Sequence, residues 1–231
     1  MLSWTPRLAA LVLLALPASA QGTVQVMLYG HVQNPTGTTI DVEFAVRAED
    51  GTERTAVAVH MALLPNTRAF DVVALLDARL TEAKVRHVAP APPSDPNQAT
   101  LFVDGLTRVQ LRVSDGLSAT IGLPEGAPSS VQLLPPLARS GKASLEFHGV
   151  TSDARLRKRG VIDFGLELAA DATPTMAVES LANACARANW LSERPTHETW
   201  KPSATFEGLE LVGTSFSLGT SQADWGLELR L

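Results

Sequence analysis

The sequence has little cysteine and few aromatic residues. One cysteine, Cys185, occurs among 231 residues, and Phe, Trp and Tyr together make up 5% of the chain. Because a single thiol cannot form a disulfide within the chain, an ordinary apolar core must hold the fold together. Cys185 lies in an Ala-rich stretch of helical pattern, where a free cysteine usually acts as a small hydrophobic residue. The sequence therefore favours a structural role for Cys185 over a catalytic one.

The sequence also lacks the common signatures of catalysis. There is no Walker loop, no Gly-x-Gly-x-x-Gly and no His-Glu-x-x-His. Residues 213–217 come nearest to a nucleophile elbow, but they lack its last glycine and lie in a predicted strand. The five histidines have no metal-ligand spacing, and a long-range site from His31 and His148 is the alternative. We predict no metal and no cofactor, and we favour a protein without enzymatic activity.

An excess of positive charge is also missing. The chain has 19 Lys and Arg against 24 Asp and Glu, so we expect no nucleic-acid partner. One basic run interrupts this pattern, and it contains Arg155, Arg157, Lys158 and Arg159. Such a run could bind an anionic partner, or it could be a solvated hairpin tip that keeps a sheet edge from pairing with other chains. We favour the hairpin tip.

Long apolar runs are absent after residue 20. Before that point, Arg7 precedes a short apolar run over residues 8–16, and Ala18-Ser19-Ala20 fits the small-x-small rule for signal peptidase. The run is shorter than the roughly 20 apolar residues that span a bilayer. We therefore predict a signal peptide over residues 1–20, with cleavage after Ala20. The protein would then be secreted or periplasmic and have no membrane span; an uncleaved anchor is the alternative.

Most of the remaining chain alternates between apolar and polar residues, which is typical of half-buried strands. The expected strands cover residues 23–32, 40–47, 55–64, 100–103, 106–113, 117–123, 143–150, 160–170, 205–209, 212–218 and 223–231. Two stretches, beginning near Pro65 and near Thr173, show helical spacing instead. We expect Phe70, Val73 and Leu76 of the first helix to be buried on the first sheet. We expect Val178 and Leu181 of the second helix to be buried on the second sheet.

Composition divides the chain into two parts. Residues 125–141 are rich in Pro, Gly and Ser, which predicts a semi-rigid linker. The linker separates a first module over residues 21–124 from a second over residues 142–231. Each module has the order strands, helix, strands. The predicted class is therefore α+β and β-rich, with two tandem modules, each a mostly antiparallel sheet covered by one helix. The sequence leaves open whether the modules share one sheet.

The two parts also resemble each other, which predicts an internal duplication. At the helices, Thr67, Ala69 and Asp71 fall on Thr175, Ala177 and Glu179, at an offset of 108 (175 minus 67). Before and after the helices, Tyr29-Gly30 falls on His148-Gly149, Asp104-Gly105-Leu106 on Glu207-Gly208-Leu209, Val109 on Val212, and Gly122-Leu123 on Gly226-Leu227.

This pattern resembles the small hairpin–helix–hairpin modules of phage-tail and bacterial surface repeat proteins. There too, a Thr-x-Ala-x-Asp-like helix start, here Thr67, Ala69 and Asp71, follows a strand and precedes a Gly-rich hairpin. The resemblance covers both halves of the chain.

The best ligand candidate in the sequence is the loop between two tryptophans. Its residues are Trp190, Glu193, Arg194, His197, Glu198 and Trp200. The rings could stack on a sugar or contact a peptide, or they could close the end of the core under the loop, which we favour. Our leading hypothesis is an exported, non-enzymatic structural, assembly or binding protein, with self-assembly, a glycan or a protein as partner. The alternatives are a carbohydrate- or peptide-binding module that uses this loop and, last, a hydrolase that uses Asp104 and Glu207.

Overall fold

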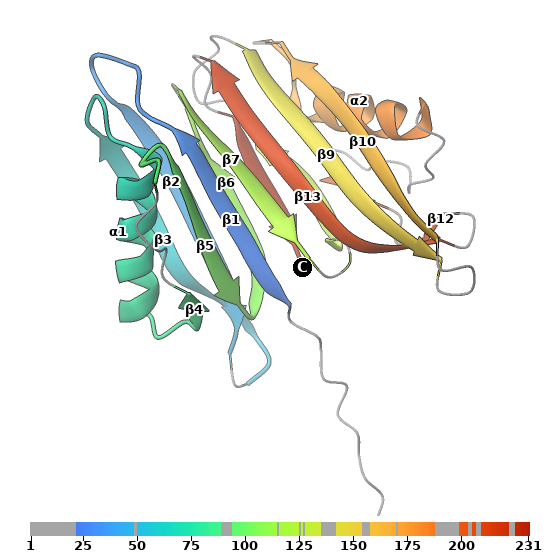
Figure 1. The fold of residues 1–231 in the computed structure, drawn as a ribbon, viewed down its shortest axis with the longest axis horizontal. Coiled ribbons are helices and arrows are strands. Elements are labelled where there is room, and N and C mark those ends of the chain that lie inside the picture. Colours follow the sequence, from blue (N-terminus) through green and yellow to red (C-terminus); the bar gives the residue numbers. More distant parts are fainter. Residues whose placement is uncertain are drawn as a thin grey trace, which may run out of the picture.

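Two antiparallel β-sheets, with a helix at either flank, form the protein (Figure 1). A computed structural model describes residues 22–48, 50–88, 94–114, 116–124, 126, 128–134, 142–153, 158–169, 171–187, 199–202, 205–206, 209–221 and 225–231. In these residues the chain forms 14 strands and two helices. The predicted β-rich α+β class is confirmed.

One sheet, called the front sheet, has the strand order β10-β9-β13-β7-β1-β5-β4, with β12 beside β13. Its strands are β1 (Thr23–Gly30), β4 (His87–Val88), β5 (Gln98–Asp104), β7 (Leu117–Leu123), β9 (Lys142–Asp153), β10 (Lys158–Leu168), β12 (Thr205–Phe206) and β13 (Leu209–Ser221). The back sheet has the order β11-β8-β14-β6-β2-β3. Its strands are β2 (Thr38–Arg47), β3 (Glu53–Leu63), β6 (Leu106–Arg112), β8 (Ser130–Leu134), β11 (Thr199–Trp200) and β14 (Gly226–Arg230).

The core lies between the two sheets and follows from the alternation in the sequence. In β1, Val24, Val26 and Leu28 are buried, while Gln25 and Met27 are only partly covered. Successive side chains of a strand point to opposite faces of its sheet, so each strand gives one row to the core and one to the outside. Full burial of a Val or Leu side chain stabilises the fold by about 1.5–3 kcal/mol.

The helices close the flanks between the sheets instead of covering an outer face. Helix α1 (Ala69–Glu82) packs against β1 and β5 of the front sheet and β3 of the back sheet. Helix α2 (Pro174–Arg187) packs against β10 of the front sheet and against β8 and β11 of the back sheet. Both helices therefore contact both layers, and the outer faces of the sheets are left uncovered by them.

The predicted buried stripes are confirmed with one adjustment. Val73, Leu76, Val178 and Leu181 are fully buried, whereas Phe70 is only partly buried.

The helices contain no segment with the length and apolarity to cross a membrane in the part of the chain that the structure describes.

The two helices start differently. The backbone N–H of Arg68, before α1, donates to the carboxylate of Asp71 at 3.1 Å. At α2 the Thr173 hydroxyl accepts from the N–H of Met176 at 3.2 Å, which satisfies one of the first-turn donors. Glu179, which the overlay of the halves aligns with Asp71, is the sixth residue of α2, because that helix begins at Pro174.

The two halves share one pairing scheme with the sheets exchanged. In the first half, β1 pairs with β5 and β7, and β2 pairs with β3 and β6. In the second half, β8 pairs with β11 and β14, and β9 pairs with β10 and β13. The group β1-β5-β7 lies in the front sheet, whereas its counterpart β8-β11-β14 lies in the back sheet. The group β2-β3-β6 lies in the back sheet, and its counterpart β9-β10-β13 lies in the front sheet.

The halves are joined by two equivalent pairings, called the seams. In the front sheet β7 pairs with β13, and in the back sheet β6 pairs with β14. Each sheet is thus built from strands of both halves, which answers the question that the sequence left open. Residues 130–134, inside the predicted linker, form β8 and pair with β14 and β11. Val131 and Leu133 are buried there, since short alternation continues between the prolines.

One offset relates the helices and the β2-β3-β6 group of the first half to their counterparts in the second. Each helix has 14 residues, and α2 begins 105 positions after α1 (174 minus 69). Strand β6 has an extra residue, Thr107, opposite β2, and β13 has an extra residue, Val212, opposite β9, again 105 positions later (212 minus 107). Such β-bulges bend a strand and add local twist. The same irregularity therefore recurs at the same place in both halves.

This offset corrects the overlay taken from the sequence. The buried positions Ala69, Val72, Val73, Leu76 and Leu80 of α1 match Pro174, Ala177, Val178, Leu181 and Cys185 of α2. The offset of 108 is therefore wrong by three residues, because small polar residues at both helix starts align readily without sharing a position. Tyr29 on His148 is also wrong, since β9 occupies the place of β2 and not of β1.

Candidate functional site

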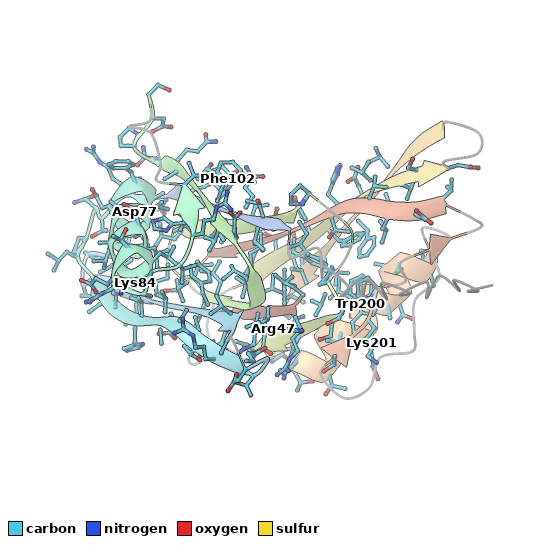
Figure 2. The ribbon with its side chains drawn as sticks, turned by 90° about the horizontal axis from the view of Figure 1, so that it is seen from below. Arg47, Asp77, Lys84, Phe102, Trp200 and Lys201 are labelled. Carbon is cyan, nitrogen blue, oxygen red and sulfur yellow. The ribbon has the colours of Figure 1, made fainter. Side chains whose placement is uncertain are left out.

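The loop residues singled out in the sequence fall mostly outside the described residues. This holds for Trp190, Glu193, Arg194, His197 and Glu198. Trp200 belongs to β11 and is fully buried. Figure 2 shows Trp200 between the layers and Phe102 at the outer side of the front sheet.

Trp200 forms part of an aromatic cluster in the core. Its ring meets those of Phe147, Phe164 and Phe216 edge-on, with centroids 5.7, 6.1 and 6.4 Å away. Such edge-to-face pairs add to the stability gained from burial. The burial favours the core-closing interpretation of this tryptophan, because the ring presents no face to a ligand.

The structure describes only some of the other sequence candidates. Arg155 and Arg157 lie outside the described residues, and Lys158 and Arg159 begin β10. Asp104 accepts a hydrogen bond of 2.6 Å from the Thr23 hydroxyl and pairs with Arg86 at 3.1 Å. These contacts tie Asp104 to the β1–β5 pair. Its proposed hydrolytic partner, Glu207, is outside the described residues.

The alternative histidine site has no support in the described residues. His31 forms an isolated bridge with Arg68, whereas His148 pairs with Asp163 on the neighbouring strand β10. Across the described ranges, no group of three His, Cys, Asp or Glu side chains is placed to hold a metal ion.

A row of three polar residues that no sequence motif marks crosses the front sheet. Asp163 of β10 stands opposite His148 of β9, which stands opposite Ser215 of β13. His148 bonds through Nδ1 to Asp163, but no hydrogen bond joins it to Ser215 in the part of the chain that is described. Interior N–H groups of a sheet are used by its ladder, so a flat face offers no oxyanion donors. The row therefore does not assemble a nucleophilic site.

A shallow depression of about 410 Å³ adjoins this row. Glu146 and His148 line it on β9, Gly165 on β10 and Ser217 on β13. Three of its polar side chains already have partners, since His148 bonds to Asp163 and Ser217 lies 2.8 Å from the Thr120 hydroxyl. The depression therefore offers a ligand few unsatisfied groups.

A second hollow, called the edge groove, has a different character. It measures about 580 Å³ and lies between β3 and α1. Its helix wall is a single stripe formed by Leu75, Arg79, Glu82 and Ala83, and its other wall is the continuous run from Ala56 to Met61. Consecutive residues of a strand point to opposite faces, so a hollow lined by all of them must follow the edge of the strand.

The edge groove exposes a free strand edge. In the described residues β3 pairs with β2 alone and ends the back sheet. A strand with one neighbour leaves every second N–H and C=O without a ladder partner, which makes it a template for another extended chain. Val59 and Met61 are partly buried beside this edge, and Leu75 of α1 is 36% exposed. The groove thus combines unpaired backbone with apolar side chains.

The four outermost strands differ in how well their free edges are protected against pairing, and β3 is the least protected. Strands β4 and β11 are two residues long, and short strands expose little edge. Strand β10 is 11 residues long but has Asp163 and Glu167 among its exposed positions. Strand β3 has the same length and has Ala58 and Ala62 at the two equivalent positions. It is the one long edge of the described sheets that charge does not protect.

Ion pairs on the outer face of the back sheet hold β3 in place. Arg108 of β6 contacts Glu43 of β2 and lies 3.1 Å from Glu53 of β3 and 3.5 Å from Glu228 of β14. Burial of the Arg108 guanidinium lowers its pKa, but these carboxylates outweigh that effect and raise the pKa overall. His60 of β3 pairs with Asp41 in the same layer. These contacts fix the edge strand to the sheet.

The sequence reasoning missed the edge groove because no motif marks it. The available signal was the run from Thr55 to Leu64, which contains one histidine and no formally charged residue.

Comparisons with known proteins add no assignment: no protein-family model matches the chain, and no curated protein matches it.

Proposed function

We propose that this protein is an exported, non-enzymatic binding or assembly protein that takes up an extended polypeptide chain along β3. The edge groove is the observation that carries this proposal. An added strand would bond to the unpaired backbone of β3 while α1 covers it from the side, which is the physics of recognition by strand addition.

The walls of the edge groove define the chemistry of the chain that fits. Val57, Val59 and Met61 form an apolar row on one side of β3, and Leu75 continues it on α1. Arg79 and Glu82 are already paired with each other at 2.9 Å, so the helix stripe has no net charge. An extended, weakly charged chain with apolar residues at alternate positions matches these walls.

Export rests on the sequence of residues 1–20, which lie outside the described residues. The proposal expects the protein to be recovered outside the cytoplasm with Gln21 as its first residue. Mass spectrometry of the intact secreted or periplasmic protein tests this, and a chain that retains Met1 to Ala20 in the cytoplasm contradicts it.

We also infer that the two halves arose by internal duplication. The shared pairing scheme supports this, and so do the helices of equal length and the bulges at Thr107 and Val212, because the helices and the bulges follow one offset. Under this proposal the edges β3 and β10 began alike and diverged in their exposed residues.

Strand addition can be tested with a labelled Val-Thr octapeptide in fluorescence anisotropy. We expect the purified protein to bind it, and we expect N-methylation of alternate residues on one edge of the peptide to abolish binding, because only that edge donates to β3. Replacing Leu75 with Glu should weaken binding. The proposal is rejected if the peptide does not bind, or if N-methylated and unmodified peptides bind equally.

A further inference from the structure

We propose that the strand occupying the edge groove is β3 of a second copy, so that two chains form a closed dimer with one continuous back sheet. This inference rests on the proposed strand addition at β3 and names its partner. Three features of the described residues carry it: the self-complementary pattern of β3, the neutral helix stripe beside it, and the unequal sheet edges.

Antiparallel pairing of β3 with its own copy brings like surfaces together. With Val59 at the centre, Val57 lies opposite Met61 of the second copy and Ala58 lies opposite its His60. Apolar residues thus meet apolar residues on the inner face, and no two like charges stand opposite each other in this span. Directly opposed like charges would have been destabilising.

The helix stripe does not oppose this pairing. In a two-fold dimer the α1 helices approach from the same side of the joined sheet. Each stripe brings an exposed Leu75 together with the Arg79–Glu82 pair, whose charges cancel within one chain. Two such stripes present apolar surface to each other without a charge conflict, and covering Leu75 removes an exposed apolar side chain from water.

The unequal edges predict the stoichiometry. An edge that pairs with its own copy about a two-fold axis closes after two chains, whereas an edge that pairs with a different edge continues into a filament. Asp163 and Glu167 on β10 disfavour the second arrangement, and β4 and β11 are two residues long. One unprotected long edge per molecule therefore gives a dimer and not a fibre.

The first test is the mass of the purified protein by sedimentation and light scattering over a wide concentration range. We expect twice the mass of one chain. Ala62→Glu and Ala62→Arg should each raise the dissociation constant roughly tenfold or more, since a charge on the exposed row of an edge strand disfavours its pairing with another strand. Both signs are needed, because a loss with only one of them would indicate a specific charge contact.

Val161→Glu is the matched control. Val161 lies on the other long edge, β10, and is 62% exposed, so the same charge there should leave the dimer intact. Hydrogen exchange gives an independent readout: the alternate amides of residues 56–61 that have no ladder partner in β2 should become protected as the wild-type concentration rises, and not in Ala62→Glu. Ala62 is exposed, so circular dichroism should show an unchanged fold in the variants.

The outcomes separate this inference from the proposed function. A monomer at all concentrations, or a dimer unchanged by both Ala62 variants, overturns the dimer. If such a protein still binds the Val-Thr octapeptide with sensitivity to N-methylation, strand addition at β3 stands and its natural partner is another protein. If it binds no peptide either, both proposals fail.

Discussion

Strands β3 and β10 occupy equivalent places and differ at their exposed positions. Both have 11 residues, and both end a sheet. Each pairs with the strand before it, and those two strands, β2 and β9, have equivalent partners. The inner rows are apolar in both. Outside, Ala58 and Ala62 of β3 correspond to Asp163 and Glu167 of β10. The comparison shows that two edge strands with apolar inner rows can differ in whether their exposed rows carry charge.

The strongest test of this comparison concerns the shared core. Leu76→Ala in α1 and Leu181→Ala in α2 remove equivalent, fully buried side chains, so each should lower the free energy of unfolding by roughly 2–5 kcal/mol. Because both sheets contain strands of both halves, either variant should still unfold in one transition. Denaturant unfolding followed by circular dichroism and by tryptophan fluorescence measures this. Two separate transitions would show that the halves are independent.

The second test removes the ion network centred on Arg108, which has no counterpart at the matching position of the second half. Arg108→Met should destabilise the fold by about 2 kcal/mol, because Arg108 is itself largely buried and contacts three carboxylates, Glu43, Glu53 and Glu228. The equivalent position in the second half is Gly213, so no arginine stands at this place on β13. Arg230→Met, at an exposed arginine that among the described residues pairs with Glu228 alone, is the control and should change stability by less than about 1 kcal/mol. Equal losses in the two variants would contradict the buried role of Arg108.

The third test makes the two edges alike. Replacing Asp163 and Glu167 with Ala gives β10 alanines where β3 has Ala58 and Ala62, which should add a second adhesive edge. We expect species larger than a dimer in light scattering, with a gain of about 1 kcal/mol per new contact, the scale of a cross-strand pair. The single replacement Ser144→Ala, on the neighbouring strand, serves as control. A variant that keeps the wild-type mass would show that charge is not what protects β10.

The smallest expected effect is at the front seam. The hydroxyls of Thr120 and Ser217 lie 2.8 Å apart and join β7 to β13 across the two halves. Ser217→Ala should cost about 0.5–1.5 kcal/mol of stability, the usual contribution of one hydrogen bond. Ser215→Ala, two residues earlier on the same face of β13, should lower the stability by less. Thermal unfolding distinguishes them, and a larger loss for Ser215 would contradict the role given to the seam contact.

Local patterns predicted the elements well. Period-two alternation located most strands, and helical spacing located both stripes, because burial on one side leaves a direct trace in the sequence. Val73 and Leu181 are examples. Strand β8 was missed because the flanking prolines dominate the composition of its surroundings and leave only five residues of alternation.

Long-range order could not be predicted in the same way. Nothing local in β7 or β13 states that they pair with each other, since each seam depends on residues about 100 positions away. The edge groove has the same origin: β3 looks like any half-buried strand until its lack of a second neighbour is known. The overlay of the helices failed because Thr and Asp mark helix starts in general, while the buried row that fixes the register became visible only with the packing.

The position of the seams has a consequence for how the chain folds as it is made. Strands β13 and β14, which supply one side of each seam, are the last two strands that the structure describes. Until these two strands are available, β7 and β6 each have an open edge, and neither sheet can be completed by the residues that precede them. Assembly of both layers therefore waits for residues 209–231, and removal of this short terminal segment should leave most of the chain synthesised but unable to close.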